Sequence, residues 1–174
     1  MTPEQAAFLR DFFVTGLGEE AKTTRRVLEA VPETGNDYRP DAKSRTGFDL
    51  AWHIAASDVW FLDGILAAEF KMETDTSQKA PEHVRTVADI VSYYEKNYIP
   101  KLQQLKSLSG EKLANVTNFF DIYSFPLVVY LAWLNNHQVH HRGQLCAYLR
   151  AMGSKVPNIY GGSADEPMQM GAGA

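Results

Sequence analysis

Residues 135–145 read NNHQVHHRGQL and contain three of the five histidines of the chain. In a helix, where each residue turns by about 100°, His137 and His141 fall about 40° apart on one face, one turn above the other. His140 falls about 60° from His137 on the other side, and Cys146, the only cysteine, falls about 180° from it. The spacing therefore predicts that His137 and His141 can bind one metal ion, while His140 and Cys146 point elsewhere.

The apolar residues around this stretch predict that the same two histidines are buried. The side chains within about 80° of His137 on the helical wheel are Leu127, Tyr130, Leu134, Leu145 and Tyr148. Each buried imidazole without a polar partner would cost about 1 to 3 kcal/mol. A shared metal ion would satisfy both rings. The alternative is that each ring forms a hydrogen bond with a neighbouring side chain or carbonyl group.

The composition predicts one globular domain that does not bind nucleic acid. The chain has 174 residues, of which 45% are hydrophobic and 22% are charged, enough to build a core. Its formal net charge is -4, from 17 basic and 21 acidic side chains, and the longest basic run is Arg25-Arg26. A nucleic-acid partner would call for a basic patch.

The sequence also gives no sign of secretion or of a membrane span. The single cysteine cannot form an internal disulfide, and residues 1–5 carry no basic side chain ahead of an apolar run. No stretch approaches the roughly 20 apolar residues that cross a bilayer. We therefore expect a cytoplasmic protein without a membrane partner.

Two amphipathic helices are predicted in the first half of the chain. The first covers about residues 3–30, with Thr2 as its N-cap. The second covers about residues 47–70 and is preceded by a capping-box pattern at residues 46–49. The turn-forming residues 31–40 predict an ordered crossover loop between these helices.

The second half predicts two more helices. The third starts after a capping box at residues 86–89, carries apolar residues to Leu108 and should bend or break at Pro100. Residues 71–81, before it, predict an exposed loop, and residues 115–123, after it, predict a linker without a strand.

The fourth helix contains the histidine-rich stretch. Ser124 and Pro126 are expected to open it, and Gly153 to close it. Four capped amphipathic helices make an all-α four-helix bundle, antiparallel or with crossover loops, the expected architecture. The cores of such bundles are where metal sites are built.

His53 supplies a possible third ligand on the second helix. It lies within about 60° of Leu50, Ser57, Trp60 and Gly64 on the wheel, and therefore on a mainly apolar face. Alone it would be interpreted as a core histidine with a local hydrogen bond. Together with the pair on the fourth helix it could provide the third nitrogen of an ion that keeps a position open for water or substrate.

Three segments of the sequence resemble one known family. Residues 50–55, LAWHIA, residues 137–145, HQVHHRGQL, and residues 148–153, YLRAMG, are similar to the DinB superfamily, also called DinB/YfiT-like proteins. The resemblance covers nearly the whole chain, from the first helix to about Gly161. The H-x3-H-R-G-Q element combined with an upstream helical histidine carries it, since either half alone would be a weak signal.

The resemblance implies a four-helix bundle with an up-down-down-up course, here residues 1–160, followed by a flexible tail, residues 161–174. It also implies a homodimer and a divalent ion, zinc or nickel, held by His53, His137 and His141. The family name refers to induction by DNA damage, but the acidic composition gives no reason to expect contact with DNA.

The expected chemistry follows from such an ion. Three histidines and an open position can lower the pKa of bound water to about 7 or polarise a carbonyl oxygen. Members of the wider superfamily resemble thiol-dependent S-transferases and isomerases, in which the metal holds a low-molecular-weight thiol as its thiolate. The expectation is therefore a thiol-dependent transferase or isomerase, or a metal-dependent hydrolase, and the sequence does not choose between them.

The alternative is a non-enzymatic protein, in which the ion stabilises the bundle or the bundle is a stress-linked binding module. A structural zinc site normally has a fourth protein ligand. None is evident in the sequence, because Cys146 points away and Asp49, about 40° from His53 on the wheel, lies one turn before it. The open position favours chemistry.

Other residues near the motif have two interpretations each. Gln144 and Tyr148 could form hydrogen bonds around the metal or pack at the edge of the core. Trp60 and Trp133 could line a pocket or be plain core. Arg142, about 140° from His137, is expected to form an ion pair on the helix surface.

Overall fold

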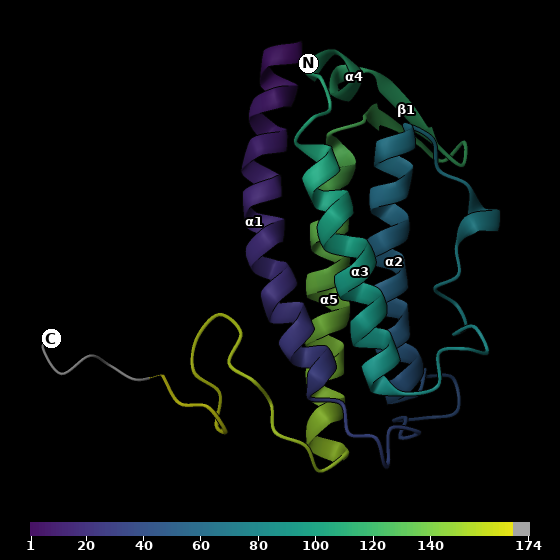
Figure 1. Cartoon of the computed structure of the whole chain (residues 1–174), viewed down its shortest axis with the longest axis vertical. Helices are drawn as coiled ribbons and strands as arrows, with labels where there is room; N and C mark the ends of the chain where they lie inside the picture. The colour runs from purple at the N-terminus through teal and green to yellow at the C-terminus, as the bar shows by residue number, and fades with distance from the viewer. Residues whose placement is uncertain (169–174) are drawn as a thin grey trace, which may run out of the picture.

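The computed structural model describes residues 1–168, which form a bundle of four long helices (Figure 1). The long helices are α1 (Pro3–Glu29), α2 (Gly47–Ala67), α3 (Val87–Leu105) and α5 (Val129–Ala151). A 3-10 turn η1 (Met72–Thr74), a short helix α4 (Gly110–Ala114) and the strands β1 (Val116–Phe119) and β2 (Tyr123–Pro126) complete the fold. The predicted all-α bundle is therefore confirmed.

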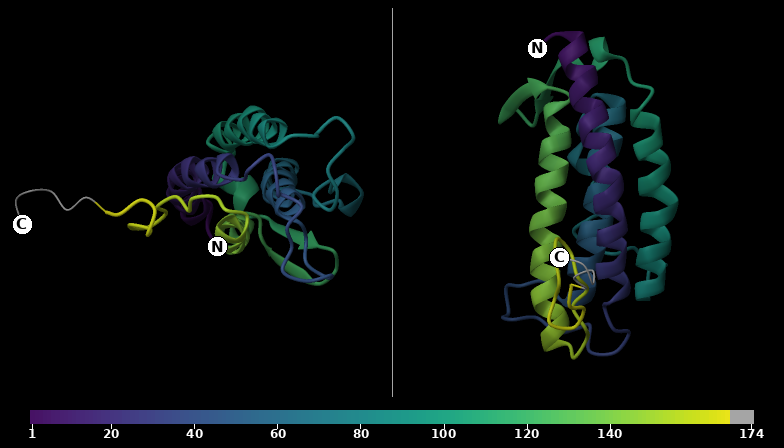
Figure 2. Two further views of the ribbon diagram at one scale, coloured as in Figure 1. Left: turned by 90° about the horizontal axis from the view of Figure 1, so that it is seen from below. Right: turned by 90° about the vertical axis from the view of Figure 1, so that its left-hand side faces the viewer.

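The helices occupy the four corners of the bundle, as the end-on view of Figure 2 shows. Both α1 and α2 pack against α3 and α5, so that α1 lies diagonally opposite α2. In Figure 1, α2 and α3 run in one direction and α1 and α5 in the other, because the long segment 68–86 crosses back along the bundle. This is the up-down-down-up course that the family resemblance implied.

The predicted N-caps set the starts of three helices. The Thr2 hydroxyl accepts a hydrogen bond from the Gln5 backbone N–H at 3.3 Å, and Thr86 forms a capping box with Asp89. Thr46 caps α2 by accepting from the Asp49 N–H at 3.0 Å. The Asp49 carboxylate accepts from the Thr46 hydroxyl, not from its backbone, so this third cap is not the predicted reciprocal box.

The second helix ends three residues earlier than expected. Ala68 has a φ of 60°, in the left-handed region, and the Glu69 N–H bonds back to the Gly64 carbonyl at 3.0 Å. The Phe70 ring then folds over Gly64, where a side chain would meet it. The apolar Phe70 therefore packs on the helix from outside and does not continue it.

Of the bend or break predicted at Pro100, the break does not occur, since α3 continues from Val87 to Leu105 through this proline. Pro100 and Lys96, whose carbonyl loses its partner, are both exposed. Water can solvate that carbonyl, which removes much of the cost of an interior proline.

The linker predicted at residues 115–123 is instead part of a β-hairpin. Strands β1 and β2 pair antiparallel, with Asn118 opposite Ser124 and Val116 opposite Pro126. The predictions of a strandless linker and of a helix opening at Ser124 were therefore wrong, and α5 begins at Val129 without a side-chain cap. A serine and a proline also fit the end of a short edge strand, where a missing N–H is tolerated.

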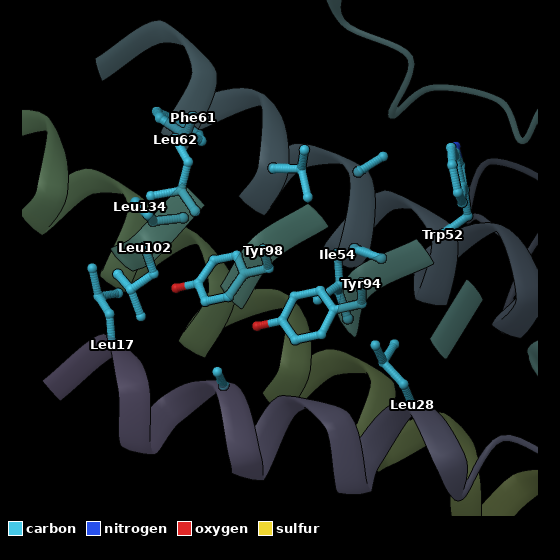
Figure 3. Close-up of a cluster of buried hydrophobic side chains, with 14 of the residues drawn as sticks. Leu17, Leu28, Trp52, Ile54, Phe61, Leu62, Tyr94, Tyr98, Leu102 and Leu134 are labelled. Carbon is cyan, nitrogen blue, oxygen red and sulfur yellow. The ribbon is translucent and has the colours of Figure 1, made fainter. Parts of the chain in front are cut away.

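Two of the buried tyrosines lie together among the aliphatic side chains of the core. Figure 3 shows Tyr94 and Tyr98 of α3 between Leu17 and Leu28 of α1 and residues of the other helices. The two tyrosine rings stack with centroids 4.8 Å apart, and both are at most 1% exposed.

Residues 152–168, after α5, lie outside the four helices and are held by ion pairs (Figure 2). Asp165 pairs with Arg150 at 2.8 Å, and Glu166 pairs with Arg26 of α1. The boundary between a bundle of residues 1–160 and a flexible tail of residues 161–174 remains a prediction, and residues 169–174 lie outside the described part. Within residues 1–168, no helix is long and apolar enough to cross a membrane.

Candidate metal centre

The structure brings together the three histidines that the sequence singled out. His53 comes from α2, and His137 and His141 come from successive turns of α5. One ring nitrogen from each lies within 4.8 Å of the other two. The ring centroids are 5.2 Å apart for His53 and His137, 4.6 Å for His53 and His141, and 4.5 Å for His137 and His141. Among the described residues, His140 and Cys146 are not part of this group.

The other ring nitrogen of His53 is held by the loop after α2. Its Nδ1 lies 3.4 Å from the Ser77 carbonyl oxygen and 3.3 Å from the Ser57 hydroxyl. Because a carbonyl only accepts, we assign the proton to Nδ1, which leaves the Nε2 lone pair free for a metal ion. The loop was predicted to be exposed, but Ser77 is 1% exposed, because the Trp52 indole donates to the Thr76 carbonyl at 2.8 Å and anchors the loop.

His141 is oriented from its own helix. Its Nδ1 lies 3.1 Å from Oε1 of Gln144, one turn later, and the Gln144 amide donates to the Tyr148 hydroxyl at 3.5 Å. The amide oxygen accepts from Nδ1–H, which again leaves Nε2 free. Of the two interpretations of Gln144, the structure favours the hydrogen bond to the ligand histidine.

A residue that the sequence analysis missed lies behind His137. Asp58 of α2 is fully buried, and its Oδ1 lies 3.9 Å from Nδ1 of His137. Asp58 falls about 140° from His53 on the helical wheel, so the face of His53 excluded it. The available signal was an aspartate within the apolar stretch of residues 54–62, where a charge is rarely buried without a partner.

The electrostatics keep all three histidines neutral. Burial lowers the pKa of His53 to about 3, and the positive charge of Arg45 adds to this effect. Burial likewise lowers the pKa of His137 and of His141 to about 4 each. Neutral imidazoles have the lone pairs that a divalent cation needs. Three converging nitrogens, with acceptors behind the rings of His53 and His141, therefore fit such an ion.

A cavity of about 230 Å³ opens beside the histidines and includes His53 and His137 in its wall. Its other lining residues are mainly apolar, Trp60, Phe61, Met72, Phe119 and Phe120, together with the polar residues Ser57, Asp75, Ser77 and Gln78. Of the two interpretations of Trp60, pocket lining or plain core, the structure therefore supports the first. Trp133 packs against Phe119, with ring centroids 5.4 Å apart, and does not line this cavity.

Comparison with known proteins now identifies the family. The model of the DinB family matches residues 12–171. The chain belongs to the DinB family. A crystal structure of a DinB-like protein from Bacillus cereus superposes with a TM-score of 0.70 at 26% identity, covering 85% of this chain and 95% of that one.

Two further relatives belong to Bacillus subtilis. A crystal structure of a DinB-like protein, YjoA, gives a TM-score of 0.65 at 20% identity over 84% of this chain and 96% of that one, which supports the fold. An uncharacterised protein, YrdA, is 27% identical over 166 residues, 92% of this chain and 93% of its own. The matches to these DinB-like proteins and to YrdA thus extend over most of this chain.

In this DinB family member, Arg142 of the H-R-G-Q element is buried, so the predicted surface ion pair is wrong. It is 1% exposed and pairs with the Glu20 carboxylate of α1 and the Tyr160 hydroxyl. Its second guanidinium nitrogen donates to the Thr24 hydroxyl at 3.0 Å. Because α5 packs between α2 and α1, a side chain that points away from the histidines meets α1 and not solvent.

Several polar atoms in this part of the DinB family bundle are buried without a hydrogen-bond partner among residues 1–168. They belong to Asp58, Tyr94, Tyr98, His137 and Gln138. Burial raises the pKa of Asp58 well above its ordinary value, although the nearby Arg142 charge and Tyr94 hydroxyl act in the opposite direction. A polar region therefore extends from behind His137 into the centre of the bundle.

Proposed function

We propose that this chain is a divalent-metal-dependent enzyme whose ion is held by Nε2 of His53, His137 and His141. The observation that carries this proposal is the convergence of three neutral imidazole nitrogens within 4.8 Å of one another. The described residues offer no fourth His, Cys, Asp or Glu in that group. Three protein ligands with an open position are typical of catalytic and not structural zinc sites.

The residues around the histidines would fix them for this task. Ser77 and Gln144 hold the Nδ1 atoms of His53 and His141, and Asp58 stands behind His137. Acceptors in these positions set the tautomer and orientation of ligand histidines. The mainly apolar cavity next to them would keep water away from a bound substrate.

The reaction that we propose first is thiol-dependent S-transfer or isomerisation. When bound, a divalent cation lowers the pKa of a coordinating thiol and so supplies a nucleophile at neutral pH. Cys146, the only cysteine of the chain, is outside the histidine group, and burial raises the pKa of its thiol. The thiol would therefore be a small molecule. Hydrolysis is the second candidate, favoured by the polar residues Ser57 and Asp75 in the lining of the cavity.

Elemental analysis combined with two substrate screens would test this proposal. Purified protein should contain about one zinc or nickel ion per chain. A screen of small thiols with electrophilic co-substrates, run beside a screen of esters and amides, would separate transferase from hydrolase. A His137→Ala variant should lose the metal and the activity together, while His140→Ala, which changes an exposed neighbour outside the group, should keep both.

A protein without stoichiometric metal would contradict the proposal, as would a folded His137→Ala variant that keeps its activity. Metal binding without any reaction in either screen would favour the non-enzymatic alternative. We also propose a homodimer in the cytoplasm, on the strength of the family resemblance and the composition. A monomeric mass in sedimentation at micromolar concentration would refute the dimer.

A further inference from the structure

Four aromatic residues line the cavity beside the histidines. Trp60 and Phe61 come from α2, and Phe119 and Phe120 come from the hairpin. Metal binding by the three histidines does not require these rings. Because His53 and His137 line the same cavity, a molecule with an atom at the open position of the ion would extend toward them.

The four rings pack against one another, which fixes their orientations. The Trp60 and Phe120 rings are parallel within 8°, with centroids 6.2 Å apart, and the Phe61 and Phe119 rings are parallel within 10°, at 6.4 Å. The Trp60 indole donates a hydrogen bond to the Lys71 carbonyl at 3.0 Å, which holds its orientation. Aromatic rings that are already fixed lose little freedom when another ring packs against them.

The backbone that carries Phe120 is strained. Phe120 and Asp121 have φ values of 55° and 57°, and the turn closes with a hydrogen bond from the Ile122 N–H to the Phe119 carbonyl at 3.1 Å. Asparagine and glycine are the residues that such hairpin turns favour, and a bulky side chain in the left-handed region is an outlier. Strained residues of this kind gather at ligand sites, where their surroundings hold them. Here the strain places a ring in the cavity wall.

We infer that the cavity binds an aromatic ring of the substrate and that Phe120 selects for it. The inference rests on the proposed function, since the donor atom of the same substrate would occupy the open position at the histidines. The volume is sufficient, because an apolar cavity of about 150 Å³ already binds benzene. The ligand class is therefore a small thiol that carries an aromatic ring.

Calorimetry on the zinc-loaded protein with three matched thiols would test the inference. We expect 2-phenylethanethiol to bind about tenfold or more tightly than ethanethiol, because the ring is buried. It should also bind at least about twofold more tightly than 2-cyclohexylethanethiol, which has a similar apolar bulk but no flat face. Equal affinity for the phenyl and ethyl probes, or for the phenyl and cyclohexyl probes, would overturn the assignment of an aromatic group.

The variant Phe120→Gly removes the ring and suits the backbone of the turn, so the hairpin should still fold. We expect it to reduce the preference for the phenyl probe to about threefold or less, while its zinc content and its affinity for ethanethiol stay as in the parent protein. The control is Tyr123→Ala, which removes an aromatic ring from the same hairpin but outside the cavity lining. An unchanged preference in Phe120→Gly, or an equal loss in the control, would contradict the role of Phe120.

A probe without a thiol separates this inference from the proposed function. Saturation-transfer NMR of the metal-free protein with 2-phenylethanol should show binding that Phe120→Gly abolishes. If zinc fails to bind but this signal is present, the proposed function is wrong and the cavity is still an aromatic-binding site. If zinc and ethanethiol bind but neither aromatic probe is preferred, the proposed function stands and the inference is wrong.

Discussion

Oδ1 of Asp58 lies 3.9 Å from Nδ1 of His137, and neither atom has a hydrogen-bond partner within residues 1–168. The separation exceeds that of a hydrogen bond. Both side chains are held by the packing of α2 against α5, so the carboxyl group stands behind the one histidine of the group that lacks another acceptor. His53 and His141 have theirs in Ser77 and Gln144.

The variant Asp58→Asn should therefore weaken zinc binding by about 10- to 100-fold, the usual effect of losing an outer partner of a ligand histidine. Competition with a chromophoric chelator measures the affinity. The control is Asp63→Asn, which changes an exposed aspartate of the same helix that pairs with Lys101. If Asp58 only supported packing, the metal-free variant would unfold at a lower temperature while the zinc affinity stayed as in the parent.

Acid should destabilise the metal-free protein through its three histidines. Their folded-state pKa values, about 3 for His53 and about 4 for His137 and His141, lie below the ordinary value of 6.5. The unfolded chain therefore binds more protons than the folded chain between pH 6.5 and about 4. The free energy of unfolding should fall as the pH decreases through this range, with a slope of up to about three protons.

Urea unfolding at pH 7, 6, 5 and 4 would give this slope. A variant in which glutamine replaces all three histidines should show a shallower dependence, because these groups no longer titrate. The same slope in both proteins would assign the acid sensitivity to other residues.

Replacing Arg142 with methionine should lower the free energy of unfolding by about 3 kcal/mol, because it leaves the Glu20 carboxylate without its buried partner. Urea unfolding measures the loss. In the control, Arg150→Met, an exposed ion pair with Asp165 is removed, and stability should change little. Similar losses in both variants would refute the special role of the buried guanidinium.

Two glycine-to-alanine variants should have opposite effects. A side chain at Gly64 would meet the Phe70 ring, so Gly64→Ala should cost about 1 to 3 kcal/mol. Gly16, in the interior of α1, has nothing within 4 Å of the added carbon, so Gly16→Ala should stabilise the protein by about 0.5 to 1 kcal/mol. Thermal unfolding of both variants would reveal the difference in sign.

The parts of the fold that depend on local sequence could be predicted. The caps at Thr2, Thr46 and Thr86 depend on residues only a few positions apart, and the spacing of His137 and His141 is a property of one helix. The apolar face of His53 indicated that its helix packs on the core. These features predicted the helical bundle and the grouping of the three histidines without any knowledge of tertiary contacts.

What the sequence analysis missed depends on contacts between elements. The helical wheel of α5 predicted that the Arg142 side chain points away from the histidines. It could not predict that α1 packs on that side of α5 and buries the side chain. The wheel of α2 excluded Asp58 from the face of His53, although a second face of the same helix meets His137. The hairpin was missed because its short strands resemble a linker, and its aromatic residues find their partners, such as Trp60, only in the folded chain.

Because the histidines are divided between α2 and α5, an ion would be bound fully only after both helices have packed together. A partly folded chain that has formed only α5 already displays His137 and His141, which together would give a weak two-nitrogen site. The third nitrogen, from His53, comes within reach only when the crossover segment has brought α2 alongside. The ion would then bridge two distant parts of the chain and close a large loop between them. Tight metal binding would thus be a property of the fully folded bundle and not of partly folded chains.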